Sequence, residues 1–196
     1  MKTLIVTPYL GSTYGGTSKV VTEIVQEVAS LGIDVDLIAT NANGLDNLDV
    51  PLNTWITQKD YRVKYFPCWH RNDFIISPSL INWLFKHIIN YNVVHTHTIF
   101  CPLISLSHWA CKFHKIPYVM TPHGMLDPWA LSYKAHKKRF YYNLLEKPTL
   151  QQASAIQVLA SSEVEQLKSL GLQHSILVPN GIHQQQFETI TEPELF

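Results

Sequence analysis

One histidine lies where a side chain could do chemistry, in the stretch TPHGMLDPWAL at residues 121–131. His123 follows a short apolar run, residues 117–121, that has the composition of a buried strand. Turn chemistry explains the nearby glycine and proline, because both commonly interrupt regular elements. It does not explain a titratable ring beside Gly124, with Trp129 close behind to offer a stacking face. His123 is therefore a candidate functional residue, and the competing interpretation is a structural histidine.

A second candidate stretch is VVHTHTIF, residues 93–100. His95 and His97 are two residues apart, so on a strand they share one face, as metal ligands can. Cys101, His108, Cys111 and His114 follow, which keeps a metal site and metal-dependent hydrolysis open. No carboxylate or firmly spaced partner accompanies the pair, so we favour His97 as polar lining of a crevice.

A third stretch, GSTYGGTS at residues 11–18, separates a predicted strand from a predicted helix. Glycines let the backbone approach an anion, and a helix N-terminus presents free N–H groups to it. No GK[ST] follows, so this is not a Walker A loop, and it is not GxGxxG either. We predict phosphate or sugar contact here, the alternative being a flexible turn. Asn180-Gly181, after the last predicted strand, is by itself typical of a turn.

Short apolar runs alternate with helical patterns along the chain, which predicts crossover units and a parallel sheet. The expected fold class is α/β, a Rossmann-like doubly wound and mostly parallel sheet of about seven strands, with helices on both faces. A loop is expected at 41–60, and a capping box at 162–165 is expected to open a helix reaching about residue 170. Strands are expected at 4–6, 35–40, 61–67, 93–95, 117–121, 155–158 and 175–178, and helices near 20–28, 77–88, 103–113, 133–152 and 162–170.

Composition narrows the class of protein. The 196 residues suffice for one well-buried domain, and 46% hydrophobic with 15% charged residues suits a globular core. A formal net charge of +0 argues against nucleic acid as a partner. Three cysteines in apolar or aromatic surroundings suggest free thiols in a reducing compartment. No apolar run reaches the roughly 18 residues of a spanning helix, so we expect a cytosolic, soluble domain.

Taken together, these stretches resemble the N-terminal domain of glycosyltransferase family 4 (GT4), retaining enzymes with the two-domain GT-B fold. The resemblance rests on YGGTSKVV, VVHTHTIF, TPHGMLDPWAL, the region from KAHKKRFYY to ASSEVEQL, and LVPNGIHQQQF. It implies an N-terminal, acceptor-side domain over residues 1–183 and the start of a linker at 184–196. The donor-binding domain, with its basic pair and Glu-x7-Glu motif, is absent, so the resemblance implies a half-enzyme that is inactive alone.

The resemblance also implies a reaction and a set of site residues. A sugar would pass from a nucleotide-sugar donor to a lipid-linked or polysaccharide acceptor, in cell-surface or exopolysaccharide synthesis, without a metal cofactor. His123 would line the donor sugar site as the catalytic histidine. The implied substrate-binding residues are Gly15, Gly16, Thr17, His97, Gly124 and Asn180.

A basic run, YKAHKKRFYY at residues 133–142, follows the His123 loop. One interpretation is that this run forms a solvent-exposed helix face with no role in binding. The resemblance suggests peripheral contact with an anionic membrane at the inner face of the plasma membrane, through Lys134, Lys137, Lys138 and Arg139. A function from another class also stays open, that of a non-catalytic sugar- or phosphate-binding module.

Overall fold

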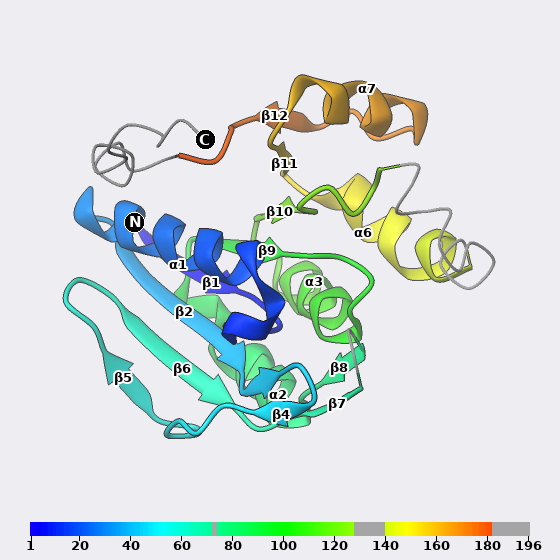
Figure 1. Cartoon of the computed structure of the whole chain (residues 1–196). Coiled ribbons are helices and arrows are strands. Elements are labelled where there is room, and N and C mark those ends of the chain that lie inside the picture. Colours follow the sequence, from blue (N-terminus) through cyan, green and yellow to red (C-terminus); the bar gives the residue numbers. More distant parts are fainter. Residues whose placement is uncertain (72–73, 128–139, 182–196) are drawn as a thin grey trace, which may run out of the picture.

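The computed structural model describes residues 1–71, 74–127 and 140–181. Its centre is an eight-stranded sheet, in which every neighbouring pair is parallel except the edge strand β5 with β6 (Figure 1). This confirms the predicted α/β class and the mostly parallel, doubly wound sheet. In spatial order the strands are β12 (Ser175–Leu177), β11 (Ala155–Val158), β10 (Tyr118–Thr121), β9 (Val93–His97), β1 (Lys2–Val6), β2 (Asp34–Thr40), β6 (Arg62–Phe66) and β5 (Trp55–Thr57).

Helices cover both faces of the sheet, as predicted. Helix α1 (Gly16–Ser30) packs Val21 and Val25 onto one face, where they meet Ile5. The larger core lies on the opposite face, which α2 and α3 cover, and Leu4 and Val6 point into it. The remaining described helices are α2 (Pro78–His87), α3 (Pro102–His114), α6 (Lys147–Gln152), α7 (Ser161–Ser169), the π-helical turn Tyr142–Glu146, and the 3-10 turns Ser12–Tyr14 and Ile88–Asn90.

Two helix ends follow from the sequence signals. The hydroxyl of Ser77 accepts a hydrogen bond from the Leu80 N–H at 3.3 Å, with Pro78 in the first turn of α2. Gly32, just past the end of α1, has φ +78°, a left-handed conformation that glycine adopts without a Cβ penalty.

The predicted capping box at residues 162–165 is wrong. Helix α7 begins earlier, after Ala160, which offers no side-chain cap. Glu163 therefore occupies the third helical position, and its carboxylate reaches back to accept a hydrogen bond from the Leu159 N–H at 2.8 Å. The carboxylate thus bonds to the residue before the N-cap and not to the N-cap itself, and no hydroxyl caps the helix, so the geometry is not that of a capping box.

The predicted loop at residues 41–60 is also wrong in part. It contains β3 (Ala42–Asn43), β4 (Asp46–Asn47) and the edge strand β5, and a second unpredicted hairpin pairs β7 (Trp69–Arg71) with β8 (Phe74–Ile76). Strands of two or three residues are too short to show an alternating pattern. Strand β5 is stabilised by tertiary contact, because the Trp55 ring lies under the Arg62 guanidinium at 4.7 Å.

Several expectations concern segments outside the described ranges. Residues 133–139 of the predicted helix at 133–152, with Lys134, Lys137, Lys138 and Arg139, lie outside them, and so do Trp129 and the proposed linker at 184–196. The part of the predicted helix that the structure describes contains two elements, the π-helical turn Tyr142–Glu146 followed by α6. No described helix has the length and apolar character needed to cross a membrane. The three cysteines are free thiols.

Candidate functional site

The glycine loop follows β1 and ends at the N-terminus of α1. Gly15 has φ +63° and precedes the first helical residue, Gly16, so the free N–H groups of the first turn of α1 begin here. A Cβ at either glycine would meet no atom within 4 Å. These glycines therefore leave open space in front of the helix end, as an incoming anion would require.

A hairpin that the sequence did not predict supports this loop. The Thr13 hydroxyl donates to the Asn43 side-chain oxygen at 2.8 Å, and a Cβ on Gly11 would lie only 2.3 Å from that oxygen. The Ser18 hydroxyl donates to the Gly11 carbonyl at 2.9 Å. Gly11 is therefore glycine because of close packing, whereas Gly15 is favoured by its backbone conformation. The hollow beside the loop, of about 450 Å³, is lined by Leu10, Ser12, Gly15, Ser18, Lys19, Thr22 and Glu23.

Three imidazoles form a column of adjacent rings at the carboxyl ends of β9 and β10. The rings of His95 and His97 lie 4.2 Å apart, and those of His97 and His123 lie 5.2 Å apart. Nδ1 of His97 is 3.0 Å from Nε2 of His123, so these two rings share one hydrogen bond. We call His95, His97 and His123 the histidine column.

Burial keeps the histidine column neutral. It lowers the pKa of His95 and of His123 to about 4, and it lowers the pKa of His97 well below its usual value. In His95 and His97, any positive charge on a neighbouring imidazole of the column lowers the pKa further. At neutral pH the column therefore offers hydrogen bonds without positive charge.

The backbone around the column is strained. His123 has φ +52° and is followed by Gly124 at φ +74°. On the neighbouring loop, Thr98 and Phe100 have φ +71° and +59°. Left-handed residues other than glycine persist only where their surroundings enforce them, and they often cluster at functional sites.

A chain of polar side chains begins at His95 of the column and crosses the same face of the sheet. We call it the polar ladder. Nε2 of His95 lies 2.7 Å from the Thr121 hydroxyl, which donates to the Gln157 side-chain oxygen at 3.2 Å. The Gln157 amide donates in turn to the Val178 carbonyl at 3.0 Å. The ladder thus ties β9, β10 and β11 to the chain segment that leads to Asn180.

Glu146 is a functional candidate that the sequence analysis did not name. Its carboxylate is fully buried and accepts hydrogen bonds from the Phe100 N–H at 2.9 Å and the Ser105 hydroxyl at 3.0 Å. Its other oxygen, Oε2, has no hydrogen-bond partner within residues 1–71, 74–127 and 140–181, and burial raises the pKa of Glu146 to about 7. The sequence signal for Glu146 is a single carboxylate among the aromatic and apolar residues of FYYNLLE, within the helix predicted at residues 133–152.

The predicted site residues are only partly brought together. His97 and His123 are in contact, whereas Gly15, Gly16 and Thr17 lie at the N-terminus of α1, after a neighbouring strand. Gly124 belongs to a turn that lies against α7, with the place of its missing Cβ 3.8 Å from a Glu163 carboxylate oxygen. That all of these residues line one cleft stays a prediction.

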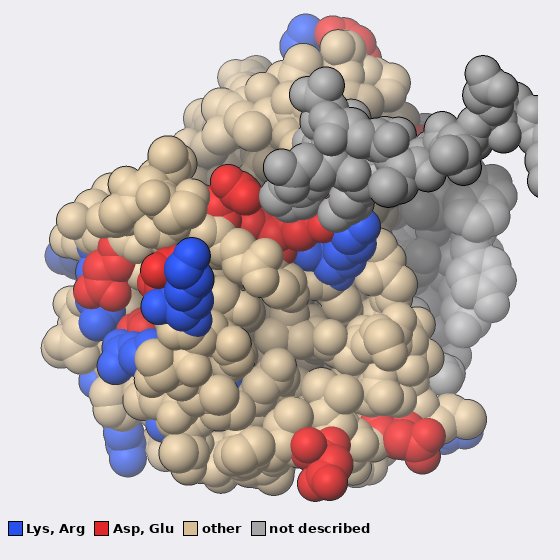
Figure 2. Space-filling model, turned by 60° about the vertical axis from the view of Figure 1, so that its left-hand side comes forward, with Lys and Arg blue, Asp and Glu red and all other residues tan. Residues whose placement is uncertain are grey.

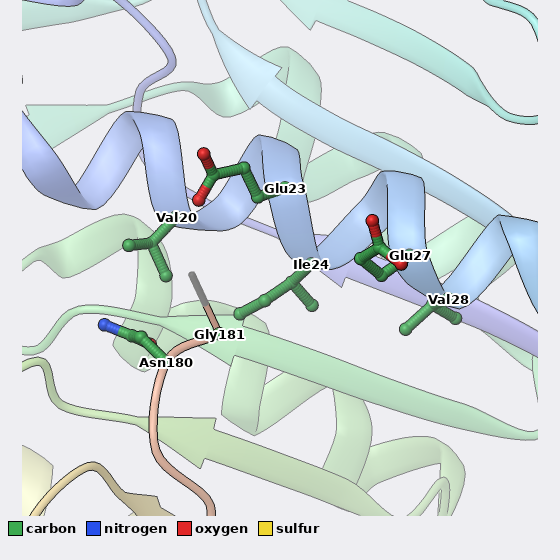
Figure 3. A pocket seen from close by; sticks show the side chains of 7 residues that line it. All are labelled: Val20, Glu23, Ile24, Glu27, Val28, Asn180 and Gly181. Atoms are coloured by element: carbon green, nitrogen blue, oxygen red, sulfur yellow. The ribbon is translucent and has the colours of Figure 1, made fainter. Parts of the chain in front are cut away.

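Asn180 lies beside α1. With Gly181 it faces the apolar stripe of Val20, Ile24 and Val28 across a groove of about 440 Å³ (Figure 3). Glu23 and Glu27 stand on the rim of this groove. The segment after β12 thus returns across the sheet toward the first helix (Figure 1).

The described residues offer no metal centre, since no group of three or more His, Cys, Asp or Glu side chains within them is arranged to hold an ion. His95 and His97 bond to Thr121 and His123 instead. On the face shown in Figure 2, acidic and basic side chains are interspersed on a largely uncharged surface. No single-sign patch suited to a polyanion stands out on the described part of this face.

Comparison with known proteins identifies the class of domain. The family model described as Glycosyltransferase Family 4 matches residues 14–186. No curated protein sequence matches the chain significantly. Among solved structures, Anabaena HepE in complex with UDP superposes with a TM-score of 0.61 at 14% identity, over 95% of this chain and 46% of that one.

Two further structures share the fold at low identity. UDP-N-acetylglucosamine 2-epimerase from Rickettsia bellii gives a TM-score of 0.55 at 12% identity, over 92% of this chain and 45% of that one. MurG from Acinetobacter baumannii gives 0.54 at 9% identity, over 94% and 46%. The chain therefore spans about half the length of each of these three structures.

Proposed function

Because the chain belongs to glycosyltransferase family 4, we propose that it is the acceptor-side half of a retaining glycosyltransferase. The proposed reaction moves a sugar from a nucleotide-sugar to a lipid-linked or polysaccharide acceptor, in cell-surface or exopolysaccharide synthesis. The observation that carries the proposal is the neutral His97–His123 pair, one strand away from a helix N-terminus fronted by two unobstructed glycines.

In this proposal the two loops have different tasks. The bond between the anomeric carbon and the diphosphate oxygen breaks, and the acceptor hydroxyl oxygen forms the new bond to that carbon while its proton passes to the leaving diphosphate or to water. The leaving nucleoside diphosphate gains negative charge, which N–H groups at Gly15, Gly16 and Thr17 would stabilise. The His123 imidazole would donate a hydrogen bond to the sugar and fix its pose, with Gly124 and Asn180 beside the bound substrates. This charge stabilisation requires no metal ion, so EDTA should not change turnover.

UDP-sugars are the donors to test first, because structures of Anabaena HepE contain UDP, UDP with glucose, and UDP-glucose. Two proteins would be assayed for release of nucleoside diphosphate: the chain alone, and a longer protein that also contains the region encoded after residue 196. Turnover is expected only for the longer protein, since the donor domain is proposed to supply most of the nucleotide contacts. If the longer protein turns over none of a panel of nucleotide-sugars, the transferase proposal fails.

A second function from another class is a non-catalytic sugar- or phosphate-binding module. The observation that favours it is the open space in front of the first turn of α1, which could hold a sugar or a phosphate without a second domain. Isothermal titration of the chain with candidate acceptor glycans and with inorganic phosphate tests this alternative. Tight binding by the chain, together with no turnover by the longer protein, would favour the module.

We further propose a cytoplasmic location with peripheral contact to an anionic membrane. The basic run at Lys134, Lys137, Lys138 and Arg139 is one candidate contact, and each cation would contribute about 1 kcal/mol near an anionic leaflet. A second candidate is the outer face of α3, where Trp109 and Phe113 are 51% and 73% exposed. Lys112 lies over the Trp109 ring at 5.6 Å, and residues 74–126 contain no acidic residue.

Co-sedimentation with anionic vesicles at low salt tests this contact. Lys137→Glu with Lys138→Glu should abolish binding if the basic run is responsible, and Trp109→Ala with Phe113→Ala should do so if the α3 face is. Leu45→Ala, which removes an exposed apolar side chain on another surface, serves as the control. Equal binding to neutral vesicles, or none to anionic ones, contradicts membrane contact.

A further inference from the structure

The hydrogen bond between His97 and His123 has a direction that the surrounding structure determines. Both imidazoles are neutral at neutral pH, so each carries one proton on one of two nitrogens. Nδ1 of His97 and Nε2 of His123 lie 3.0 Å apart and can hold only one proton between them. Two arrangements are possible, and they leave different atoms of His123 free to bind substrate.

The buried side of His97 distinguishes the two arrangements. His97 is completely buried, and its Nε2 has no hydrogen-bond partner among the residues that the structure describes. If Nδ1 accepted from His123, the proton of His97 would sit on Nε2 as a buried N–H with no acceptor. If Nδ1 carries the proton, Nε2 is an unprotonated acceptor whose lone pair makes no hydrogen bond. Orphaned buried N–H groups are rarer than under-satisfied acceptors, so the second arrangement is favoured.

His95 does not alter this choice. The Thr121 hydroxyl donates its proton to Gln157, so it must accept from His95, whose proton is therefore on Nε2. The His95 ring is tilted by 35° from the His97 ring, with 4.2 Å between ring centroids. No hydrogen bond joins these two rings among the described residues, so the proton of His97 is set by His123 and by its own orphaned nitrogen.

We infer that His97 is a positioning residue that donates from Nδ1 to Nε2 of His123 and so fixes the proton of His123 on Nδ1. Nδ1 of His123 has no partner within the described part of the chain, and it is then a hydrogen-bond donor available to a ligand. His123 would bind an oxygen that offers a lone pair, such as a sugar hydroxyl or a phosphoryl oxygen. In its resting form it would not act as a general base through this atom. This inference rests on the proposed function only for the identity of the ligand.

The tautomers can be measured without turnover. Histidine in water prefers the proton on Nε2, so the inference predicts the less common form for both His97 and His123, and the common form for His95. Two-bond ¹H–¹⁵N correlation spectra of the ¹⁵N-histidine-labelled chain at pH 7.5 distinguish the forms directly. A spectrum with the proton of His123 on Nε2 overturns the inference, whatever the activity of the longer protein.

Two substitutions of His97 separate positioning from a merely structural role. His97→Asn places an amide N–H near the former Nδ1 and should keep the proton of His123 on Nδ1. His97→Asp places an acceptor there, so His123 should switch its proton to Nε2 and its pKa should rise. If both variants leave the His123 tautomer unchanged, His97 does not set it.

A matched control comes from the other face of the sheet. His108 is equally buried, bonds through Nε2 to the Thr96 hydroxyl at 2.8 Å, and does not contact the histidine column. His108→Gln should leave the ¹H–¹⁵N signals of His123 unchanged. If those signals change, the tautomer shifts seen in the His97 variants are explained by general loosening of the fold. In the longer protein, turnover by His97→Asp should be at least tenfold lower than turnover by His97→Asn. The reverse order of these activities contradicts the inference even if the tautomers are as expected.

Discussion

The carboxylate of Glu146 accepts a hydrogen bond from the backbone N–H of Phe100 at 2.9 Å, and the two residues are 46 positions apart in the sequence. Phe100 is in the left-handed conformation and lies in the loop that follows His97. Glu146 lies in the π-helical turn, where an extra residue per turn is often associated with function. A buried acid from a distant helix thus stabilises the strained loop beside the histidine column.

Removing this acid should destabilise the fold more than neutralising it. Glu146→Ala leaves the Phe100 N–H without its acceptor, removes one of the acceptors near the Ser105 hydroxyl and opens a cavity, for a loss of about 2–4 kcal/mol. Glu146→Gln keeps an acceptor oxygen and nearly the same shape, so the loss should be within about 1 kcal/mol. Denaturant unfolding at pH 7 measures both. Equal losses for the two variants would show that the hydrogen bonds are unimportant.

Stability should increase with pH between about 4 and 6.5. Burial lowers the pKa of His95 and His123 to about 4 and of His108 to about 3, so the unfolded chain binds more protons in this range. The contribution of these neutral histidines is complete above pH 6.5 and is lost as the pH falls. Glu146 has the opposite effect on stability, because burial raises its pKa to about 7 and the folded chain then binds the extra proton. The several buried histidines together outweigh this single carboxyl group. Urea midpoints across pH 4–8 check the slope, which should steepen in Glu146→Gln.

Substituting His123 should reduce turnover without unfolding the protein. In the longer protein, His123→Ala removes the proposed hydrogen bond to the sugar and should lower kcat by roughly 10- to 100-fold. His123→Asn tolerates the left-handed backbone at φ +52° and should lose less stability than alanine. Steady-state kinetics and thermal unfolding are measured side by side. Wild-type rates in both variants would make His123 a structural residue.

Three glycine substitutions should have three different outcomes. Gly16→Ala meets no neighbour at the start of α1 and should leave stability unchanged or slightly higher, yet it should lower turnover if phosphate contacts this helix end. Gly15→Ala is strained, because φ +63° with ψ −134° is readily adopted only by glycine, and should cost at least about 1 kcal/mol. Gly11→Ala should cost more, because its Cβ would collide with Asn43. If Gly16→Ala has full activity, phosphate contact at this position is not supported.

The sequence by itself determined the architecture. Continuous apolar runs such as 4–6 and the capped start of α2 at Ser77 are local signals, and alternating strands and helices allow few topologies. The predicted strands at 93–95 and 117–121 also imply that His97 and His123 lie at the same edge of the sheet, because carboxyl ends of parallel strands lie together. Family resemblance added the expected reaction.

Tertiary structure decided what surrounds these residues. Strand β5 and the hairpin of β3 and β4 exist because of contacts to Arg62 and to Thr13, and such contacts leave no periodic pattern in a two- or three-residue stretch. The role of Glu146 depends on a partner far away in the sequence, which no local rule can supply. The direction of the His97–His123 hydrogen bond depends on burial of one nitrogen, and burial is a property of the folded chain alone.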